Sequence, residues 1–190
     1  MSFFPPKAKS VLVLCPAAAC LALDLLTKAF AKAHLDAAIS RPVTGFLNLV
    51  LTHNPGAAFS LFSGDGQAQG LKMAGLALLS MIPLFWFYRL AGPRDRGTLV
   101  SLGLVVGGAL GNVHDRLRYG AVVDFLDFHL GDRHWPAFNV ADAAICVGLG
   151  LLIVLTVRSA RREPRTGQAK PGRGDRLGRK GAGPKNPTRI

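Results

Sequence analysis

The chain has 190 residues, of which 49% are hydrophobic, and its mean hydropathy is +0.29. These values are typical of a membrane protein and argue against a water-soluble globular domain. The net charge of +12 suggests a nucleic-acid partner at first, but residues 158–190 alone hold eleven Lys or Arg and only two acids. The basicity is therefore mostly a property of the C-terminal tail, and no nucleic-acid partner is expected.

Four apolar segments are long enough, with flanking residues, to cross a bilayer, which takes about 20 residues of helix. They cover about residues 11–27, 71–88, 98–113 and 140–157. We therefore predict a membrane all-α bundle of four transmembrane helices. The first segment resembles a signal peptide up to Cys20, but its apolar run continues, so an uncleaved span is expected.

Basic residues orient these spans. They are Lys7 and Lys9 before the first span, Arg89, Arg94 and Arg96 between the second and third, and the tail after the fourth. All lie on one side, which the positive-inside rule makes cytoplasmic. Both termini are then cytoplasmic, and the loops at about 27–70 and 114–139 face outward.

The first outer loop has structure of its own. Residues 45–54, "GFLNLVLTHN", alternate as a strand does, and residues 54–60 predict a turn followed by another short extended piece. Residues 28–39 are interpreted as an interfacial helix. Because open strand edges are tolerated only at the boundary of the hydrocarbon, we expect a small extracytoplasmic β-sheet cap at about 43–62.

Polar side chains gather at the predicted outer ends of the spans. They are Asp24, Asn54, Asn112, Asp115, Arg116, Asp124, Asn139 and Asp142. An ionised carboxylate at membrane depth costs about 3 kcal/mol or more. Their convergence on one level of a bundle therefore indicates a functional site.

Some of these acids have structural explanations. Asp24 precedes Lys28 by four residues, so the two can pair on one helix face. Asp115 can pair with the adjacent Arg116 or with Arg118. Asp127 and the nearby Asp132 are interpreted as solvated loop residues.

Asp124 and Asp142 are harder to explain in this way. Asp124 lies in the apolar frame "AVVDFLDF", with no adjacent basic residue. Asp142 opens the fourth span, where the helix dipole favours an acid. Two close carboxylates share one proton, which suits an aspartyl protease, whereas the alternative use is a proton relay in a transporter.

Other residue types carry less information. The five histidines lack a recognised ligand spacing, so no metal or other cofactor is expected. Cys15, Cys20 and Cys146 lie in apolar runs and are interpreted as buried small hydrophobic side chains. The glycines within 107–111 lie inside a span, where small residues permit close helix packing.

The tail at 159–190 is rich in Gly, Pro, Arg and Lys and poor in large apolar residues. It is expected to be a disordered basic cytoplasmic tail, because it buries too little surface to offset its ordering entropy. Binding of this tail to anionic lipid or RNA is the alternative.

Four motifs together resemble one family. They are "DLLTK" (24–28), "NPGAAFS" (54–60), "GGALGNVHDRLRYGAVVDFLDF" (107–128) and "FNVADAAICVG" (138–148). In this order they resemble the lipoprotein signal peptidase family (signal peptidase II, or prolipoprotein signal peptidase), which are four-span bacterial membrane aspartyl proteases. The resemblance covers about residues 10–158 and implies a peptidase domain at 1–158.

The resemblance implies cleavage of a diacylglyceryl-modified prolipoprotein just before its lipidated cysteine, at the outer face of the bacterial inner membrane. It implies that Asp124 and Asp142 are the catalytic pair and that Asp24 and Lys28 are a structural pair. Supporting or substrate-binding roles are implied for Asn54, Gly56, Asn112, Asp115, Arg116, Asn139 and Ala141.

The chain departs from the family pattern at His114, where the family usually has an apolar residue, and in its long basic tail. Membrane lipids are expected partners, and the chain is expected to be a monomer. A proton-coupled transporter and a non-catalytic membrane anchor with a lipid- or RNA-binding tail are the alternative functions. The transporter would require acids at the midplane and broken or repeated helices, neither of which the sequence indicates.

Overall fold

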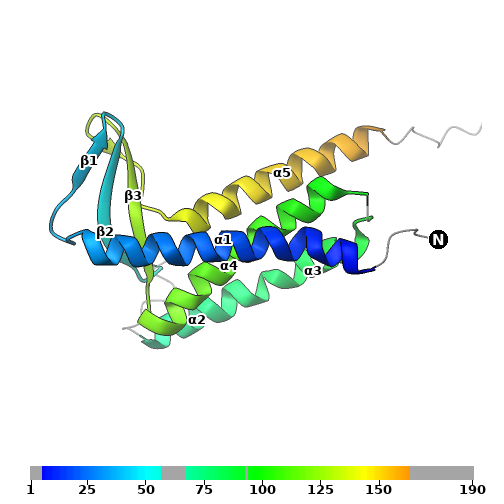
Figure 1. Cartoon of the computed structure of the whole chain (residues 1–190), viewed down its shortest axis with the longest axis horizontal. Helices are drawn as coiled ribbons and strands as arrows, with labels where there is room; N and C mark the ends of the chain where they lie inside the picture. Colours follow the sequence, from blue (N-terminus) through cyan, green and yellow to red (C-terminus); the bar gives the residue numbers. More distant parts are fainter. Residues whose placement is uncertain (1–5, 57–66, 93, 163–190) are drawn as a thin grey trace, which may run out of the picture.

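The computed structural model describes residues 6–56, 67–92 and 94–162. A long bundle of helices carries a small sheet at one end, while α1 begins and α5 ends at the other end (Figure 1). The extended piece expected after Asn54 falls mostly outside the described residues, as does the tail from 163 onward. The last helix continues to Arg162, past the expected boundary at 158.

Four segments of the described chain are long and apolar enough to cross a membrane, as the sequence predicts. The helices are α1 (Pro6–His34), α2 (Gln67–Leu79), α3 (Met81–Leu90), α4 (Arg96–Tyr119) and α5 (Val140–Arg162). The second span consists of α2 and α3 together. Each span extends beyond its apolar run, because polar residues at the ends continue the helix.

The second span is interrupted at Ser80, between α2 and α3. Pro83 lies three residues later and has no N–H to donate to the carbonyl of Leu79, with which its ring also clashes. At the interruption, the Ser80 hydroxyl donates to the carbonyl of Ala77 at 2.7 Å. The single straight span expected from the sequence is therefore two shorter helices.

The interfacial helix expected at 28–39 is not a separate element. The helix α1 runs without interruption to His34, and residues 35–40 form a turn. The segment from Ala29 to Ala33 contains no helix breaker, so the transmembrane helix continues through it.

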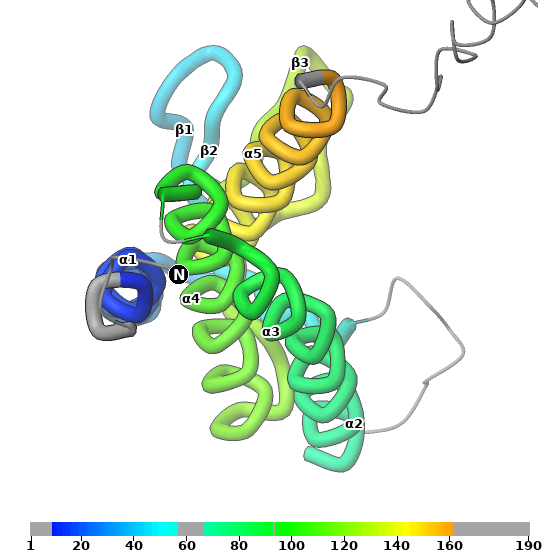
Figure 2. Tube along the Cα trace, turned by 90° about the vertical axis from the view of Figure 1, so that its right-hand side faces the viewer, coloured from blue at the N-terminus to red at the C-terminus, as the bar shows by residue number. Residues whose placement is uncertain are grey.

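The helix α4 is the centre of the bundle. In Figure 2 it lies between α1, α5 and the α2–α3 pair. Of the 18-residue apolar stretch of α4, 61% is buried inside the protein, against 17% of the corresponding stretch in α1 and in α5. Glycines allow this closeness: a Cβ at Gly107 would lie 2.5 Å from the carbonyl oxygen of Ala17, and one at Gly108 would overlap the carbonyl oxygen of Ala141. The prediction that these glycines permit close packing is confirmed.

The same helix is longer than the expected third span, which ended near residue 113. It ends at Gly120, whose φ of 74° is the left-handed conformation of a helix C-cap, and whose N–H donates to the carbonyl of Arg116. Asp115 and Arg116 therefore lie on the last turns of a helix and not in a loop.

The sheet has four strands in the order β1-β2-β3-β4, with antiparallel neighbours. The strands are β1 (Arg41–Thr44), β2 (Leu47–Asn54), β3 (Val122–Leu130) and β4 (Arg133–His134). The predicted strand at 45–54 is thus present as β2. Its main partner is β3, a strand where the sequence predicts only an outer loop, and Thr52 lies opposite Asp124 in their register.

Candidate active site

Asp124 and Asp142 lie at the sheet end of the bundle, on two different elements. Asp124 is on β3 and is 2% exposed, and Asp142 is in the first turn of α5. One residue, Asn139, contacts both. Its side-chain Nδ2 donates to Asp124 Oδ1 at 2.7 Å, and its backbone N–H donates to Asp142 Oδ2 at 3.2 Å. The fold therefore brings together the two acids that the sequence analysis singled out.

The position of Asp142 follows from how α5 begins. The Oδ1 atom of Asn139 accepts a hydrogen bond from the backbone N–H of Asp142 at 3.0 Å, while Asp142 accepts the N–H of Asn139 in return. This reciprocal pair is a capping box, which satisfies two of the unpaired N–H groups at a helix start. The expectation that Asp142 acts as a helix N-terminal acid is confirmed. The Oδ1 atom of Asp142 also accepts a hydrogen bond from Asn112 Nδ2 at 2.7 Å.

Asp124 is held by amides on both carboxylate oxygens. Besides Asn139, Asn54 Nδ2 donates to Asp124 Oδ2 at 3.1 Å. Asn54 is itself oriented by a turn in which its Oδ1 accepts the N–H of Gly56 at 2.9 Å, and Gly56 has a φ of 89°. The turn is braced from α2 because Gln69 Nε2 donates to the carbonyl of Pro55 at 3.0 Å.

The electrostatics of Asp124 follow from this environment. Burial, and then the nearby carboxylate of Asp142, raise the pKa of Asp124 to about 6, although hydrogen bonds from Asn54 and Asn139 oppose the shift. A carboxyl group with such a pKa retains its proton well above the usual range for aspartate. Below about pH 6, Asp124 therefore keeps a proton that it could donate.

A second carboxylate cluster lies beside the first and is organised by Lys28. The Nζ atom of Lys28 is 2.8 Å from Asp24 Oδ2, 2.9 Å from Asp115 Oδ2 and 3.1 Å from Asn112 Oδ1. Lys28 is 1% exposed and Asp24 is fully buried. An ammonium group has three N–H donors, and here three oxygen atoms lie within 3.1 Å of it. The predicted structural pair of Asp24 with Lys28 is present and includes Asp115 as a third member.

This cluster fastens four elements together, namely α1, α4, α5 and β3. Asp24 Oδ1 accepts the N–H of Ala141 at 2.9 Å, which joins α1 to the start of α5. Asp115 Oδ2 accepts the N–H of Val123 at 3.1 Å, which joins α4 to β3 one residue before Asp124. Both contacts position the strand and helix that carry Asp124 and Asp142.

The expected pairing of Asp115 with Arg116 or Arg118 is wrong. Neighbouring residues on a helix point about 100° apart, so Asp115 faces Lys28 across the helix interface. Arg116 Nη1 instead donates to the carbonyl of Asn112 at 3.3 Å. Its Nε atom is buried and has no hydrogen-bond partner among the described residues. The His114 ring is partly exposed, with Nδ1 at 3.4 Å from Asp115 Oδ1.

Asp127 is not the solvated loop residue that the sequence suggested. It is 8% exposed on β3, with Asn48 Nδ2 at 3.1 Å and His134 Nδ1 at 2.9 Å. Burial alone would raise the pKa of Asp127, but the hydrogen bonds from His134 and Asn48 outweigh it and lower the pKa below its usual value. This cluster ties β2, β3 and β4 together. The β-branched and aromatic content of residues 122–130 is the signal that could have revealed this strand.

Cysteines and histidines contribute little to the site. Cys20 is buried, as expected, whereas Cys15 and Cys146 are exposed on the sides of their helices, where the expectation of burial is wrong. Among residues 6–56, 67–92 and 94–162, no group of three or more His, Cys, Asp or Glu side chains is arranged to hold a metal ion.

An apolar groove of about 400 Å³ reaches Asp142 from the side. Its walls are Phe128, Trp135 and Phe138 from the sheet end, and its floor is formed by Ala143 and Cys146 of α5. Cys146 follows Asp142 by one helical turn, so the groove leads from the carboxylate along α5 into the apolar span.

Comparison with known proteins identifies the family. The family model described as signal peptidase (SPase) II matches residues 16–158. With its four apolar spans, the chain is a multi-pass membrane peptidase. It belongs to the signal peptidase II family of lipoprotein signal peptidases, which are aspartic peptidases.

Relatives and solved structures agree with this assignment. A lipoprotein signal peptidase of Ralstonia nicotianae is 48% identical over 143 residues, covering 74% of this chain and 80% of the relative. One from Francisella tularensis subsp. novicida is 39% identical over 163 residues, covering 85% of this chain and 99% of the relative. A bacterial membrane enzyme structure at 2.3 Å resolution is 26% identical, with a TM-score of 0.68 over 89% of this chain and 98% of that one.

Proposed function

We propose that this protein hydrolyses diacylglyceryl-modified prolipoproteins just before the lipidated cysteine, with Asp124 and Asp142 as the catalytic pair. The observation that carries this proposal is that Asn139 hydrogen-bonds both carboxylates at the end of the membrane spans. Amide donors, and no cation, contact the two carboxylates in the described residues. A pair held in this way can share a proton instead of being neutralised by an ion pair.

In the proposed reaction, ionised Asp142 takes a proton from a water molecule as the water oxygen attacks the scissile carbonyl carbon. Asp124, whose pKa is raised to about 6, donates its proton to the carbonyl oxygen. The resulting gem-diol collapses when Asp142 passes its proton to the amide nitrogen of the substrate cysteine. The C–N bond breaks and Asp124 recovers a proton from a gem-diol hydroxyl, so both acids return to their starting states.

The remaining polar residues support this chemistry. Asn54, Asn112 and Asn139 orient the carboxylates without adding charge. Gly56 and Ala141 act through their backbones, which fix Asn54 and the start of α5. Arg116, with its buried Nε group, is proposed to contact the substrate backbone or to stabilise the negative charge of the pair.

The apolar groove beside Asp142 fits an acyl chain of the substrate. An extended peptide in the groove would need partners for its N–H and C=O groups. Among the described residues that line it, only Asp142 and the indole N–H of Trp135 are strong hydrogen-bonding groups. An acyl chain has no such groups. We expect Cys146→Trp to slow cleavage of long-chain substrates more than of short-chain ones.

The proposed orientation of the chain in the membrane is argued from the positions of its basic residues. The peptidase domain at 1–158 lies in the bacterial inner membrane, with the catalytic pair at the outer face, both termini in the cytoplasm, and residues 159–190 as a basic tail. Arg89, Arg94 and Arg96, at the end of the bundle remote from the sheet, support this orientation. We propose that the chain works as a monomer.

A cleavage assay in detergent tests the function. The purified chain is incubated with a diacylglyceryl-modified prolipoprotein, and the products are identified by mass spectrometry. Wild type is expected to cut before the lipidated cysteine, while Asp124→Asn and Asp142→Asn bind but do not cut. Asp132→Asn, in the exposed turn between β3 and β4, is the matched control and retains activity.

Two outcomes would overturn the proposal. Cleavage by either Asn variant at the wild-type rate would remove the proposed catalytic pair. A well-folded wild type that does not cut would favour the alternatives, namely a proton-coupled transporter or an anchor with a lipid- or RNA-binding tail. Where wild type does cut, removal of residues from 163 onward tests the anchor hypothesis, because cleavage should survive the truncation whereas a tail-dependent anchor would lose its function.

A further inference from the structure

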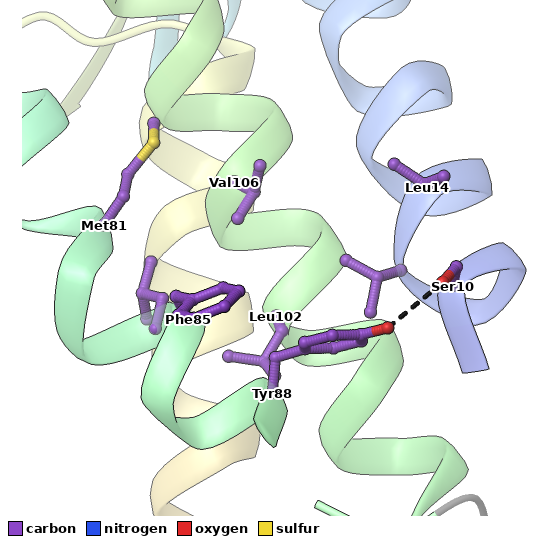
Figure 3. A pocket seen from close by; sticks show the side chains of 9 residues that line it. Ser10, Leu14, Met81, Phe85, Tyr88, Leu102 and Val106 are labelled. Carbon is purple, nitrogen blue, oxygen red and sulfur yellow. Dashed lines mark hydrogen bonds between the residues drawn. The ribbon is translucent and has the colours of Figure 1, made fainter. Parts of the chain in front are cut away.

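A cavity of about 300 Å³ lies far from the catalytic pair, between the N-terminal half of α1 and the helices α3 and α4 (Figure 3). Its lining consists of Ser10, Val13 and Leu14 of α1, Met81, Leu84, Phe85 and Tyr88 of α3, and Leu102 and Val106 of α4. Seven of these nine side chains are wholly apolar, so the cavity favours a hydrocarbon occupant and disfavours water.

The cavity has one polar end. There the Ser10 hydroxyl and the Tyr88 hydroxyl lie 3.1 Å apart and bridge α1 to α3, as the dashed line in Figure 3 shows. The Nζ atom of Lys9 lies 4.4 Å from the centre of the Tyr88 ring. This cation–π contact holds the ammonium beside Tyr88, which forms the polar end of the cavity. An apolar channel that ends at a cation matches a lipid, whose acyl chain joins an anionic headgroup.

The surroundings strengthen the charge match. Residues 6–20, 81–106 and 150–162 form this end of the bundle and contain eight Lys or Arg but a single acid, Asp95. Asp95 is engaged, since its Oδ2 accepts the N–H of Gly92 at 2.6 Å. Basic residues near a membrane surface each contribute about 1 kcal/mol to the attraction of anionic lipid.

The dimensions favour an acyl chain over a peptide. From Met81 to Tyr88 the cavity follows α3 for about 10 Å at 1.5 Å per residue. A helix of about 10 Å diameter would fill 300 Å³ within roughly one turn, and an extended peptide would lack partners for its backbone. Leu14 is 63% and Phe85 60% exposed, so the cavity opens sideways to the bilayer.

We propose that this cavity is a binding site for one anionic phospholipid, with an acyl chain between α1 and α3 and the headgroup phosphate at Lys9. The lipid fills the space between α1 and α3 and strengthens the link that the Ser10–Tyr88 contact makes between them. The site is separate from catalysis and does not depend on the proposed function.

Native mass spectrometry of the full chain tests this. The purified protein is equilibrated with equal amounts of phosphatidylglycerol and phosphatidylcholine carrying identical acyl chains, and the retained lipids are counted. Wild type is expected to retain phosphatidylglycerol about fivefold more than phosphatidylcholine, which corresponds to ~1 kcal/mol. Lys9→Gln should remove most of this preference, and Val106→Phe should reduce retention of both lipids by filling the cavity.

The chain offers a matched control at the other end of α1. There Lys32 Nζ lies 4.1 Å from the centre of the Tyr119 ring, but Lys32 lines none of the described cavities. Lys32→Gln should therefore leave the lipid preference unchanged. Leu14→Phe, which fills the cavity from its lipid-facing side, serves as a second filling variant if Val106→Phe is poorly folded.

The proposal is overturned if wild type retains both lipids equally. It is also overturned if Lys9→Gln and Lys32→Gln change the preference to the same extent, because the effect would then be general surface charge. Unchanged retention in a folded cavity-filling variant would likewise place the lipid elsewhere.

Discussion

Two carboxylate pairs lie side by side at the sheet end of this protein, and they differ in what holds them. Asp24 and Asp115 share the ammonium of Lys28, at 2.8 and 2.9 Å. Asp124 and Asp142 share the amides of Asn139. The ammonium of Lys28 offsets the charge of the acids that it contacts, whereas the amide donors of Asn139 carry no charge. The first pair therefore suits structure, and the second suits proton transfer.

The amide-held pair should give the largest effect when it is broken. Asp124→Asn is expected to lower the cleavage rate by about 10⁴-fold or more, as loss of an essential catalytic group does in other proteases. Its thermal stability should be retained, because an amide of the same shape keeps one of the two hydrogen bonds at this site. Turnover and the midpoint of thermal unfolding are the two measurements, and a large fall in both would place Asp124 with the structural pair.

The cation-held pair should respond in the opposite way. Lys28→Met leaves two buried carboxylates without their cation and should cost about 3–5 kcal/mol of unfolding free energy. Chemical unfolding in detergent micelles measures this. Adding Asp115→Asn to Lys28→Met should recover part of the loss, because it removes one unpaired charge. A folded Lys28→Met protein of wild-type stability would contradict the comparison.

A smaller effect is expected where α4 approaches the cation-held pair. A Cβ at Gly111 would overlap Asp24 Oδ2, so Gly111→Ala should destabilise the protein by about 1–3 kcal/mol. At Gly150 an added Cβ would meet nothing within 4 Å, so Gly150→Ala is the matched control and should not destabilise. Thermal unfolding of the two variants gives the comparison, and equal losses would rule out this explanation.

The smallest effect concerns pH. Because the pKa of Asp124 is raised to about 6, from 3.8, the folded protein holds this proton more tightly than the unfolded chain. The resulting stabilisation is complete below pH 3.8 and is lost as the pH rises through about 6. The value of kcat/KM should likewise fall by up to tenfold per pH unit above about 6, as Asp124 loses the proton that it donates. A flat profile from pH 5 to about 8 in the free enzyme would contradict this assignment.

The sequence revealed the acids of both pairs but only some of their partners. The spans are long apolar runs, and the Asp24–Lys28 pair is local to one helix, so both could be predicted. The partner of Asp115 could not, because Lys28 lies 87 residues earlier and meets it only when α1 packs on α4. Sequence adjacency favoured Arg116, which lies on a different face of α4.

The missed strand has a similar cause. Residues 122–130 were placed in an outer loop because strand pairing is a long-range property, and β2 lies more than sixty residues away. Their apolar and aromatic content was a usable signal. By contrast, the place of Asp142 at the start of a helix is a local property, and the sequence predicts it. The capping box that it forms with Asn139, three residues earlier, was not predicted.

The dual engagement of Asn139 bears on drug resistance. Its side chain and backbone together hold both carboxylates and begin α5. A substitution that weakened the binding of an inhibitor at this residue would also disturb the helix start and the proposed catalytic pair. A compound that hydrogen-bonds with Asn139 would therefore leave the bacterium few escape mutations that preserve a working enzyme.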